Sequence, residues 1–145
     1  MADMTWNAWI DSLISNSRNL KGEPQIDKAC IIGLRDGGLW HRADHPNALI
    51  LKEEEANKIA RVFRGKEIAP FVNDGIPIAG HDYVYFDGDD VVDVVAKGRN
   101  ASEDGIYLYT SKTAIVIGHC PSMNDQTLAD KTISDIAQKL KDLEL

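Results

Sequence analysis

Residues 106–119, IYLYTSKTAIVIGH, contain two short apolar runs separated by polar residues. The runs are Ile106 to Tyr109 and Ala114 to His119, and they are rich in the β-branched and aromatic residues that favour strands. Between them, Ser111 and Lys112 are typical of a turn, and so short a connection joins antiparallel neighbours. This stretch therefore predicts two adjacent antiparallel strands of a sheet.

The same strand pattern recurs towards the amino terminus. Apolar runs predict further strands at Ala29 to Leu34, Ile76 to Ile78, Tyr83 to Phe86 and Val91 to Ala96. Glycine supplies the positive φ angle that tight turns require. We expect turns at Asp36-Gly37-Gly38, at Asp87-Gly88 and at Gly98, and a returning hairpin strand at Leu39 to Arg42.

Three segments carry apolar residues at helical spacing. They are residues 5–17, Glu53 to Arg64 and Asp125 to Leu143. The order of elements predicts an α+β fold, in which helices cover a mainly antiparallel sheet. We expect the first and last helices to pack on one face of the sheet, because each has an apolar stripe to bury. No repeat, linker or low-complexity tract interrupts residues 1–145, so we expect a single domain.

The composition is that of an ordinary globular protein. The chain has 145 residues, 43% of them hydrophobic, and a formal net charge of −7. This composition excludes a wholly disordered chain, and the acidic charge disfavours binding that depends on neutralising phosphates, as in nucleic acids. Cys30 and Cys120 lie in apolar runs and are expected to be buried free thiols, with a reactive thiol as the alternative. No secretory signal or long apolar span is visible, so we expect a cytoplasmic protein.

No catalytic motif is visible, and we do not expect an enzyme, a metal or a cofactor. The histidines, His41, His45, His81 and His119, lie on separate elements without a metal-ligand spacing. The run from Asp87 to Asp93 superficially resembles a calcium loop, but the glycine and glutamate that such a loop needs at its sixth and twelfth positions are missing. We interpret it as a solvated turn.

The three tryptophans all lie within the first 40 residues. Trp6 and Trp9 are three residues apart on the first predicted helix, and Trp40 follows the Gly37-Gly38 turn. Clustered at a surface, indole rings form slots for proline rings, and a polyproline II ligand loses little entropy on binding. Spacing alone leaves a second alternative open, in which these rings fill the core between helix and sheet.

At this point the chain resembles the profilin family along essentially its whole length. The matching stretches are residues 6–11 (WNAWID), residues 29–33 with Trp40, Gly65-Lys66, residues 71–75 (FVNDG) and residues 111–117 (SKTAIVI). The resemblance implies an antiparallel sheet with the N- and C-terminal helices side by side on one face and smaller helices on the other. It also implies binding of monomeric actin on one surface and of proline-rich segments between the terminal helices, with regulation of actin polymerisation.

The resemblance assigns roles to individual residues of this chain. The poly-proline site would use Trp6, Trp9, Trp40 and Leu140, with Leu145 where many members have a tyrosine. The actin site would use Val72 and Asn73 after a short helix, Lys97 and Arg99 at a strand end, and Lys131 with Asp135 on the last helix. Phosphoinositide lipids are a further implied partner, and Lys97, Arg99, Lys139 and Lys141 are too few for more than weak binding. The alternative function is a non-catalytic sensory or scaffold domain that binds a small ligand or a partner helix.

Overall fold

The computed structural model describes residues 6–40, 45–65, 69–89, 95–99, 104–121 and 126–145. Six strands of this part of the chain form one sheet in the order β1-β6-β5-β4-β3-β2, and every neighbouring pair is antiparallel. The strands are β1 (Lys28–Gly33), β2 (Ile76–Ile78), β3 (His81–Asp89), β4 (Val95–Arg99), β5 (Gly105–Thr110) and β6 (Ala114–Cys120). The predicted pair of residues 106–119 is confirmed as β5 and β6, which lie side by side.

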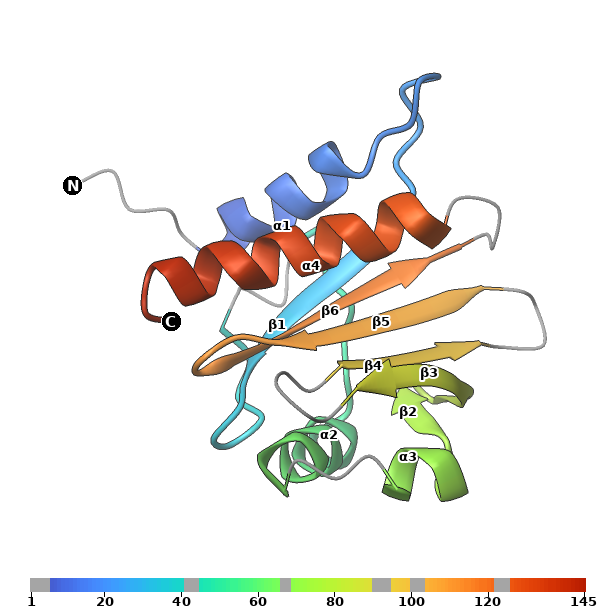
Figure 1. The fold of residues 1–145 in the computed structure, drawn as a ribbon, viewed down its shortest axis with the longest axis vertical. Coiled ribbons are helices and arrows are strands. Elements are labelled where there is room, and N and C mark those ends of the chain that lie inside the picture. Colours follow the sequence, from blue (N-terminus) through green and yellow to red (C-terminus); the bar gives the residue numbers. More distant parts are fainter. Residues whose placement is uncertain (1–5, 41–44, 66–68, 90–94, 100–103, 122–125) are drawn as a thin grey trace.

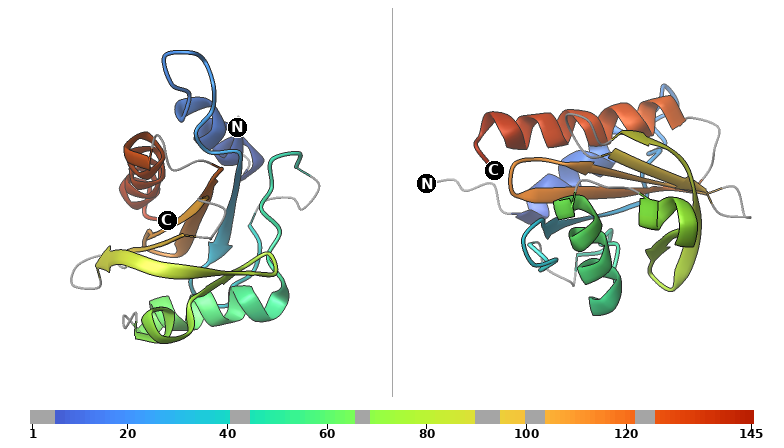
Figure 2. Two further views of the ribbon diagram at one scale, coloured as in Figure 1. Left: turned by 90° about the vertical axis from the view of Figure 1, so that its right-hand side faces the viewer. Right: turned by 60° about the horizontal axis from the view of Figure 1, so that its bottom comes forward.

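The helices lie on opposite faces of the sheet. The first and last, α1 (Trp6–Asn16) and α4 (Gln126–Asp142), lie next to each other on one face, running in opposite directions (Figure 1). The other two helices, α2 (Glu53–Gly65) and α3 (Ala69–Asp74), lie on the other face (Figure 2). The α+β class and the predicted placement of the terminal helices are therefore confirmed.

Two hydrophobic cores follow from this layering, one on each side of the sheet. The interior strand β6 serves both, because Ile115 and Ile117 face α2 and α3 whereas Val116 faces α1 and α4. This two-sided burial explains why residues 114–117 of β6 are continuously apolar. Gly118 lets α4 approach closely, since a Cβ atom at this position would run into the side chain of Ile133.

Two of the predicted turns are wrong. Asp87 and Gly88 lie inside β3, and Gly98 lies inside β4. At Gly98 the reason is packing, since an added Cβ would lie 2.9 Å from the Cβ of Tyr83 and 3.1 Å from the side chain of Ile106. Of the predicted strand Val91 to Ala96, only the last two residues are in β4, and residues 91–94 lie outside the described part.

The predicted hairpin after β1 is only partly present. Leu39 forms a single bridge with Ile32, and the N–H of Trp40 donates to the carbonyl of Ile31 at 3.0 Å. No strand covers Leu39 and Trp40, and residues 41 and 42 are not described. The chain does reverse here, because the N–H of Gly33 donates to the carbonyl of Gly38 at 2.8 Å.

The sequence did not predict helix α3, whose six residues are too few to show a period. Among the described helices, none is long and apolar enough to span a membrane. Both cysteines are free and buried, as predicted, and burial raises the pKa of the Cys30 thiol, which disfavours a reactive thiolate there.

Candidate functional site

The three tryptophans come together where α1 begins. The ring centroids of Trp6 and Trp40 are 4.7 Å apart, and those of Trp6 and Trp9 are 6.5 Å apart. Trp6 and Trp40 are half-buried, whereas Trp9 is only 7% exposed. Trp6 and Trp40 are therefore the rings that a ligand can reach, and the buried Trp9 packs against Trp6.

The end of the chain completes this group. Leu140 is fully buried and Leu145 is half-buried, and both belong to the same hydrophobic cluster as the indoles. The N–H of Leu145 donates to the carbonyl of Leu140 at 2.9 Å, and the N–H of Lys112 donates to the carbonyl of Leu145 at 2.7 Å. The β5–β6 turn thus fixes the position of the last turn of chain. We call Trp6, Trp9, Trp40, Leu140 and Leu145 the tryptophan cluster.

Gly33 determines where Trp40 lies. A Cβ atom at Gly33 would be 2.9 Å from Nε1 of Trp40 and 2.8 Å from Oδ1 of Asp36. Only glycine therefore allows the indole to lie against the end of β1. The Asp36 carboxylate also accepts the N–H of Gly38 at 2.8 Å, which fixes the turn that leads to Trp40.

The residues predicted to contact actin lie on α3, β4 and α4. Helix α3 and the start of α4 lie at the end of the molecule opposite to the start of α1 (Figure 1). Val72 and Asn73 are exposed, and they lie in α3, which follows α2 and which the sequence did not predict. Arg99 is exposed at the end of β4, and Lys131 and Asp135 form an exposed ion pair of 2.8 Å on α4. We call these five residues and Lys97 the charged end.

Lys97 differs from the rest of the charged end. Its Nζ is 2.9 Å from Oδ2 of Asp130 on α4, and its side chain is only 17% exposed. The other carboxylate oxygen of Asp130 accepts the hydroxyl of Tyr109. Lys97 therefore ties β4 to α4, and an actin contact would have to compete with this bond.

The sequence prediction missed Val84 at the charged end. Its side chain is 70% exposed on β3, and its register partner on β4 is Arg99. The strand alternation contained a signal, because Tyr83 is buried and the next residue must then point to the opposite face. Val84 adds exposed apolar area beside a predicted actin-binding cation.

A hydrogen-bonded network fastens the same end of the sheet. Nδ1 of His119 is 2.6 Å from Asp27, and its Nε2 is 2.7 Å from Asp104, which also accepts the hydroxyl of Tyr83 at 2.7 Å. Burial alone would lower the pKa of His119, but the bonds to Asp27 and Asp104 outweigh it and raise the pKa above its ordinary value. Burial would raise the pKa of Asp104, but the bonds from Tyr83 and His119 lower it. The network thus favours a charged imidazolium between two carboxylates.

Within the described residues, no group of three His, Cys, Asp or Glu side chains is arranged to hold a metal ion. His41, Asp90 and Asp93, which the sequence analysis weighed for metal binding, lie outside these residues. His45 instead bonds Asp11 at 2.6 Å, and Asp87 and Asp89 lie in β3.

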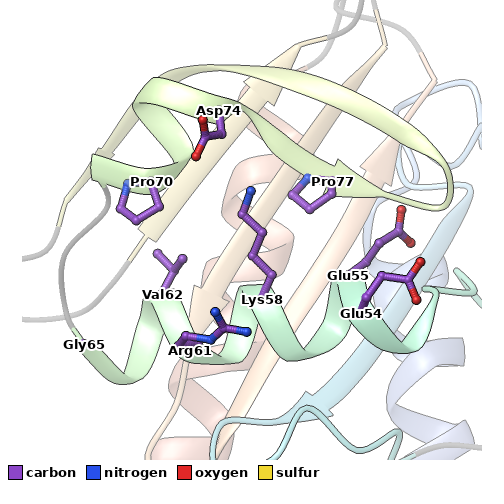
Figure 3. A pocket seen from close by; sticks show the side chains of 9 residues that line it. All are labelled: Glu54, Glu55, Lys58, Arg61, Val62, Gly65, Pro70, Asp74 and Pro77. Carbon is purple, nitrogen blue, oxygen red and sulfur yellow. The ribbon is translucent and has the colours of Figure 1, made fainter.

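A cavity of about 610 Å³ lies between α2 and α3. Lys58 extends from α2 into the space between Pro70 and Pro77 (Figure 3). The carboxylate of Glu55, on the wall of this cavity, is already hydrogen-bonded within the protein. It accepts the N–H groups of Lys52, Ala79 and Gly80 at 2.8 to 3.0 Å. The cavity contains none of the predicted site residues, and its charges are mixed.

Comparisons with known proteins agree with this geometry. The Profilin family model matches residues 4–145. A profilin of Heliocidaris crassispina is 39% identical over 140 residues, which are 97% of this chain and 99% of the relative. Mouse profilin IIa in complex with a double repeat from the FH1 domain of mDia1 superposes with a TM-score of 0.70 at 14% identity, covering 97% of this chain and 99% of that one.

A further solved structure is the complex of LokiProfilin2 with rabbit actin, whose matching chain superposes with a TM-score of 0.67 at 17% identity, covering 97% of this chain and 98% of that one. These distant structures support the fold, and the family model together with the Heliocidaris relative supports the kinship. By sequence and by fold, the chain belongs to the profilin family.

Proposed function

We propose that this protein binds monomeric actin at the charged end and proline-rich segments at the tryptophan cluster, and so regulates actin polymerisation. It acts by binding and not by catalysis, in the cytoplasm and in association with the cytoskeleton. Family membership supports both activities, since a solved relative is in complex with actin and another with an FH1 repeat.

The observation that carries the proline-binding proposal is the contact between Trp6 and Trp40. Two half-buried indoles with centroids 4.7 Å apart offer aromatic surface to solvent without exposing the core beneath them. Proline rings stack on such surfaces, and a polyproline II helix is already extended before it binds. Leu145 extends the apolar surface from the end of the chain, and Trp9 and Leu140 support it.

The actin-binding proposal rests on exposed side chains of mixed character. Val72 is 56% exposed and Lys131 and Asp135 are exposed as a pair, so both apolar area and charges of either sign are accessible to a partner. Only a few residues of such a surface dominate its binding energy. Lys97, held by Asp130, is expected to contribute least.

Phosphoinositide binding is at most a weak additional activity. Asp130, which holds Lys97, and Lys139 are nine residues apart on α4, a separation of about 13 Å along the helix axis. The four predicted cations therefore do not form one cluster. Each basic residue near an anionic membrane contributes about 1 kcal/mol, so scattered cations give only modest attraction.

The proline-binding proposal is tested by titrating the protein with decaproline and following tryptophan fluorescence. Because Trp6 and Trp40 would stack on the peptide, we expect a saturable change in emission. An unchanged emission at millimolar peptide, together with no heat by calorimetry, would refute this activity.

The actin proposal is tested with Lys131→Glu, which reverses one charge of the exposed pair and places two carboxylates side by side. We expect weaker sequestration of actin monomers in a polymerisation assay and unchanged decaproline binding. Lys21→Glu is the matched control, since Lys21 is an exposed lysine in the loop after α1 and is not among the predicted site residues. Equal loss of actin binding in both variants would contradict the assignment of Lys131, and loss of both activities in Lys131→Glu would indicate misfolding.

A further inference from the structure

We propose that a basic cavity beside Trp40 binds an acidic side chain that flanks the proline run of a bound segment. This inference rests on the proposed proline binding and concerns its specificity. The cavity has a volume of about 500 Å³, which lies within the range of small-ligand sites. Its walls include Trp40 and Leu34, three cations and one carboxylate; the charged residues are Arg35, Asp36, Arg64 and Lys112.

Arg64 is held in place as a cation of this cavity. Its Nη1 donates to the carbonyls of Leu34 and Arg35 at 3.1 and 2.6 Å. A guanidinium has five N–H donors, so those on Nε and Nη2 remain for a ligand. Arg35 is exposed and has no ion pair with any described residue. Two guanidinium groups are thus accessible at one site.

Neither arginine is paired with a nearby carboxylate. Oδ1 of Asp36 accepts the N–H of Gly38, and Glu144 is paired with Lys112. Asp36 and Glu144 keep their negative charges, so they leave one net positive charge of the three cations at the cavity, although the chain as a whole carries a net charge of −7. A carboxylate is the complementary ligand, because arginine binds it through two parallel hydrogen bonds.

The cavity is continuous with the tryptophan cluster on two sides. The indole of Trp40 lines the cavity and also contacts Trp6, and the N–H of Lys112 holds the carbonyl of Leu145. A polyproline II segment rises about 3.1 Å per residue, so a residue two or three positions beyond the last stacked proline lies about 6 to 9 Å further along. A segment on Trp6 and Trp40 would therefore place its flank at the cavity, and this continuity favours a peptide carboxylate over a lipid headgroup.

The test compares decaproline with four extended peptides, which carry two glutamates at the amino end, two glutamates at the carboxyl end, two lysines at the amino end, or two lysines at the carboxyl end. Affinities are measured by calorimetry in low salt of about 0.05 M and high salt of about 0.5 M. We expect one glutamate-flanked peptide to bind about three to ten times more tightly than decaproline in low salt, and the lysine-flanked peptides to bind no better. The advantage should disappear in high salt, where charges are screened.

Arg35→Glu should abolish the advantage of the glutamate flank without changing the affinity for plain decaproline. Arg61→Glu is the matched control, since Arg61 is an equally exposed arginine on α2 at the other cavity, and it should retain the advantage. If plain decaproline binds but neither glutamate flank helps, or if the advantage survives Arg35→Glu, the inference is overturned and the proposed function stands.

A failure of plain decaproline to bind overturns the proposed proline binding and this inference with it. A final arm uses vesicles of phosphatidylcholine with phosphatidylinositol bisphosphate. If wild-type protein binds them, Arg35→Glu does not, and glutamate flanks give no advantage, the cavity is a lipid-headgroup site instead.

Discussion

The tryptophan cluster and the charged end differ in how they would generate binding energy. At the tryptophan cluster, two large rings in contact rest on a buried third ring and on buried leucine. At the charged end, an exposed ion pair, an exposed arginine and exposed valines are spread over α3, β3, β4 and α4. Exposed ion pairs contribute little individually, whereas desolvated aromatic anchors dominate interfaces. Single substitutions should therefore act strongly at the first surface and weakly at the second.

The start of α1 and the end of α4 lie at one end of the sheet, and α3 lies at the other (Figure 1). Between them, Asp130 on α4 receives bonds from Lys97 on β4 and Tyr109 on β5. This arrangement would allow both proposed partners to be bound at once, since the two surfaces share no residue.

The largest effect should come from Trp40→Ala. It removes one of the two accessible rings and opens the space beside Gly33 and Trp6. We expect the affinity for decaproline to fall about thirtyfold, equivalent to about 2 kcal/mol, with actin binding unchanged. Calorimetry measures the first and a monomer-sequestration assay the second. A loss below threefold in a folded variant would mean that Trp40 is a packing residue only.

Tyr109→Phe probes the structure that joins the two surfaces. The substitution removes the hydroxyl that donates to the Asp130 carboxylate while keeping the ring. Since hydrogen bonds to charged groups stabilise by about 1.5 to 3 kcal/mol, we expect the free energy of unfolding to fall by about 1.5 kcal/mol in urea titrations. Both binding activities should stay within twofold, and a selective loss of one would show that this contact supports that surface directly.

Much of this fold could be predicted from the sequence, because the apolar patterns of its helices are long and its interior strands are buried on both faces. Helices α1 and α4 carry apolar stripes, and β5 and β6 each contain an apolar run, so their existence and pairing could be predicted. The predicted turn at Gly98 was wrong because glycine is needed there to make room for Tyr83. The sequence alone does not show which residues pack against a glycine. The same limit applied to α3, which is too short to show a period.

The site was predictable to different degrees at its two ends. Spacing brought Trp6 and Trp9 together, but the proximity of Trp40 depends on a turn and on Gly33, which only the fold reveals. The pairing of Lys97 with Asp130 joins residues 33 positions apart, so no local sequence pattern predicts it. Val84 was recoverable from strand alternation, because its neighbour Tyr83 is buried.

His119→Gln should have a smaller effect that depends on pH. The pKa of His119 is raised in the folded state, so its contribution to stability is complete below its unfolded pKa, about 6.5, and is lost as the pH rises through the folded pKa. The groups around it are Asp27, Asp104, Tyr83 and, along the same cavity wall, Lys28 and His81. We therefore expect wild type and variant to differ more in free energy of unfolding at pH 6 than at pH 9.

Urea titrations across this pH range measure the difference. His81→Gln serves as the control, because His81 lines the same cavity but forms none of the network bonds. A difference that grows from pH 6 to pH 9 would show that His119 is neutral in the folded protein.

The smallest effect is expected for Tyr107→Phe, two residues before Tyr109 on the same face of β5. Its ring is 1% exposed, and in the described part of the chain its hydroxyl is buried without a hydrogen-bond partner. Burial, with the charges of Cys120 and Asp130, raises the pKa of Tyr107, so the hydroxyl stays protonated. Removing an unsatisfied buried polar group is neutral or stabilising, so the free energy of unfolding should stay the same or rise by up to about 1 kcal/mol.

Tyr107→Phe and Tyr109→Phe thus form a matched pair in which the same atom is deleted from one strand. Only Tyr109 connects the strand to the carboxylate that also holds Lys97, so only its loss should weaken the link between the two surfaces. If Tyr107→Phe instead destabilises the protein as much as Tyr109→Phe, the buried hydroxyl must be bonded to internal water. The packing between β5 and α4 would then depend on more than one polar contact. The connection between the two surfaces would depend on the whole interface between β5 and α4, and less on Asp130 alone.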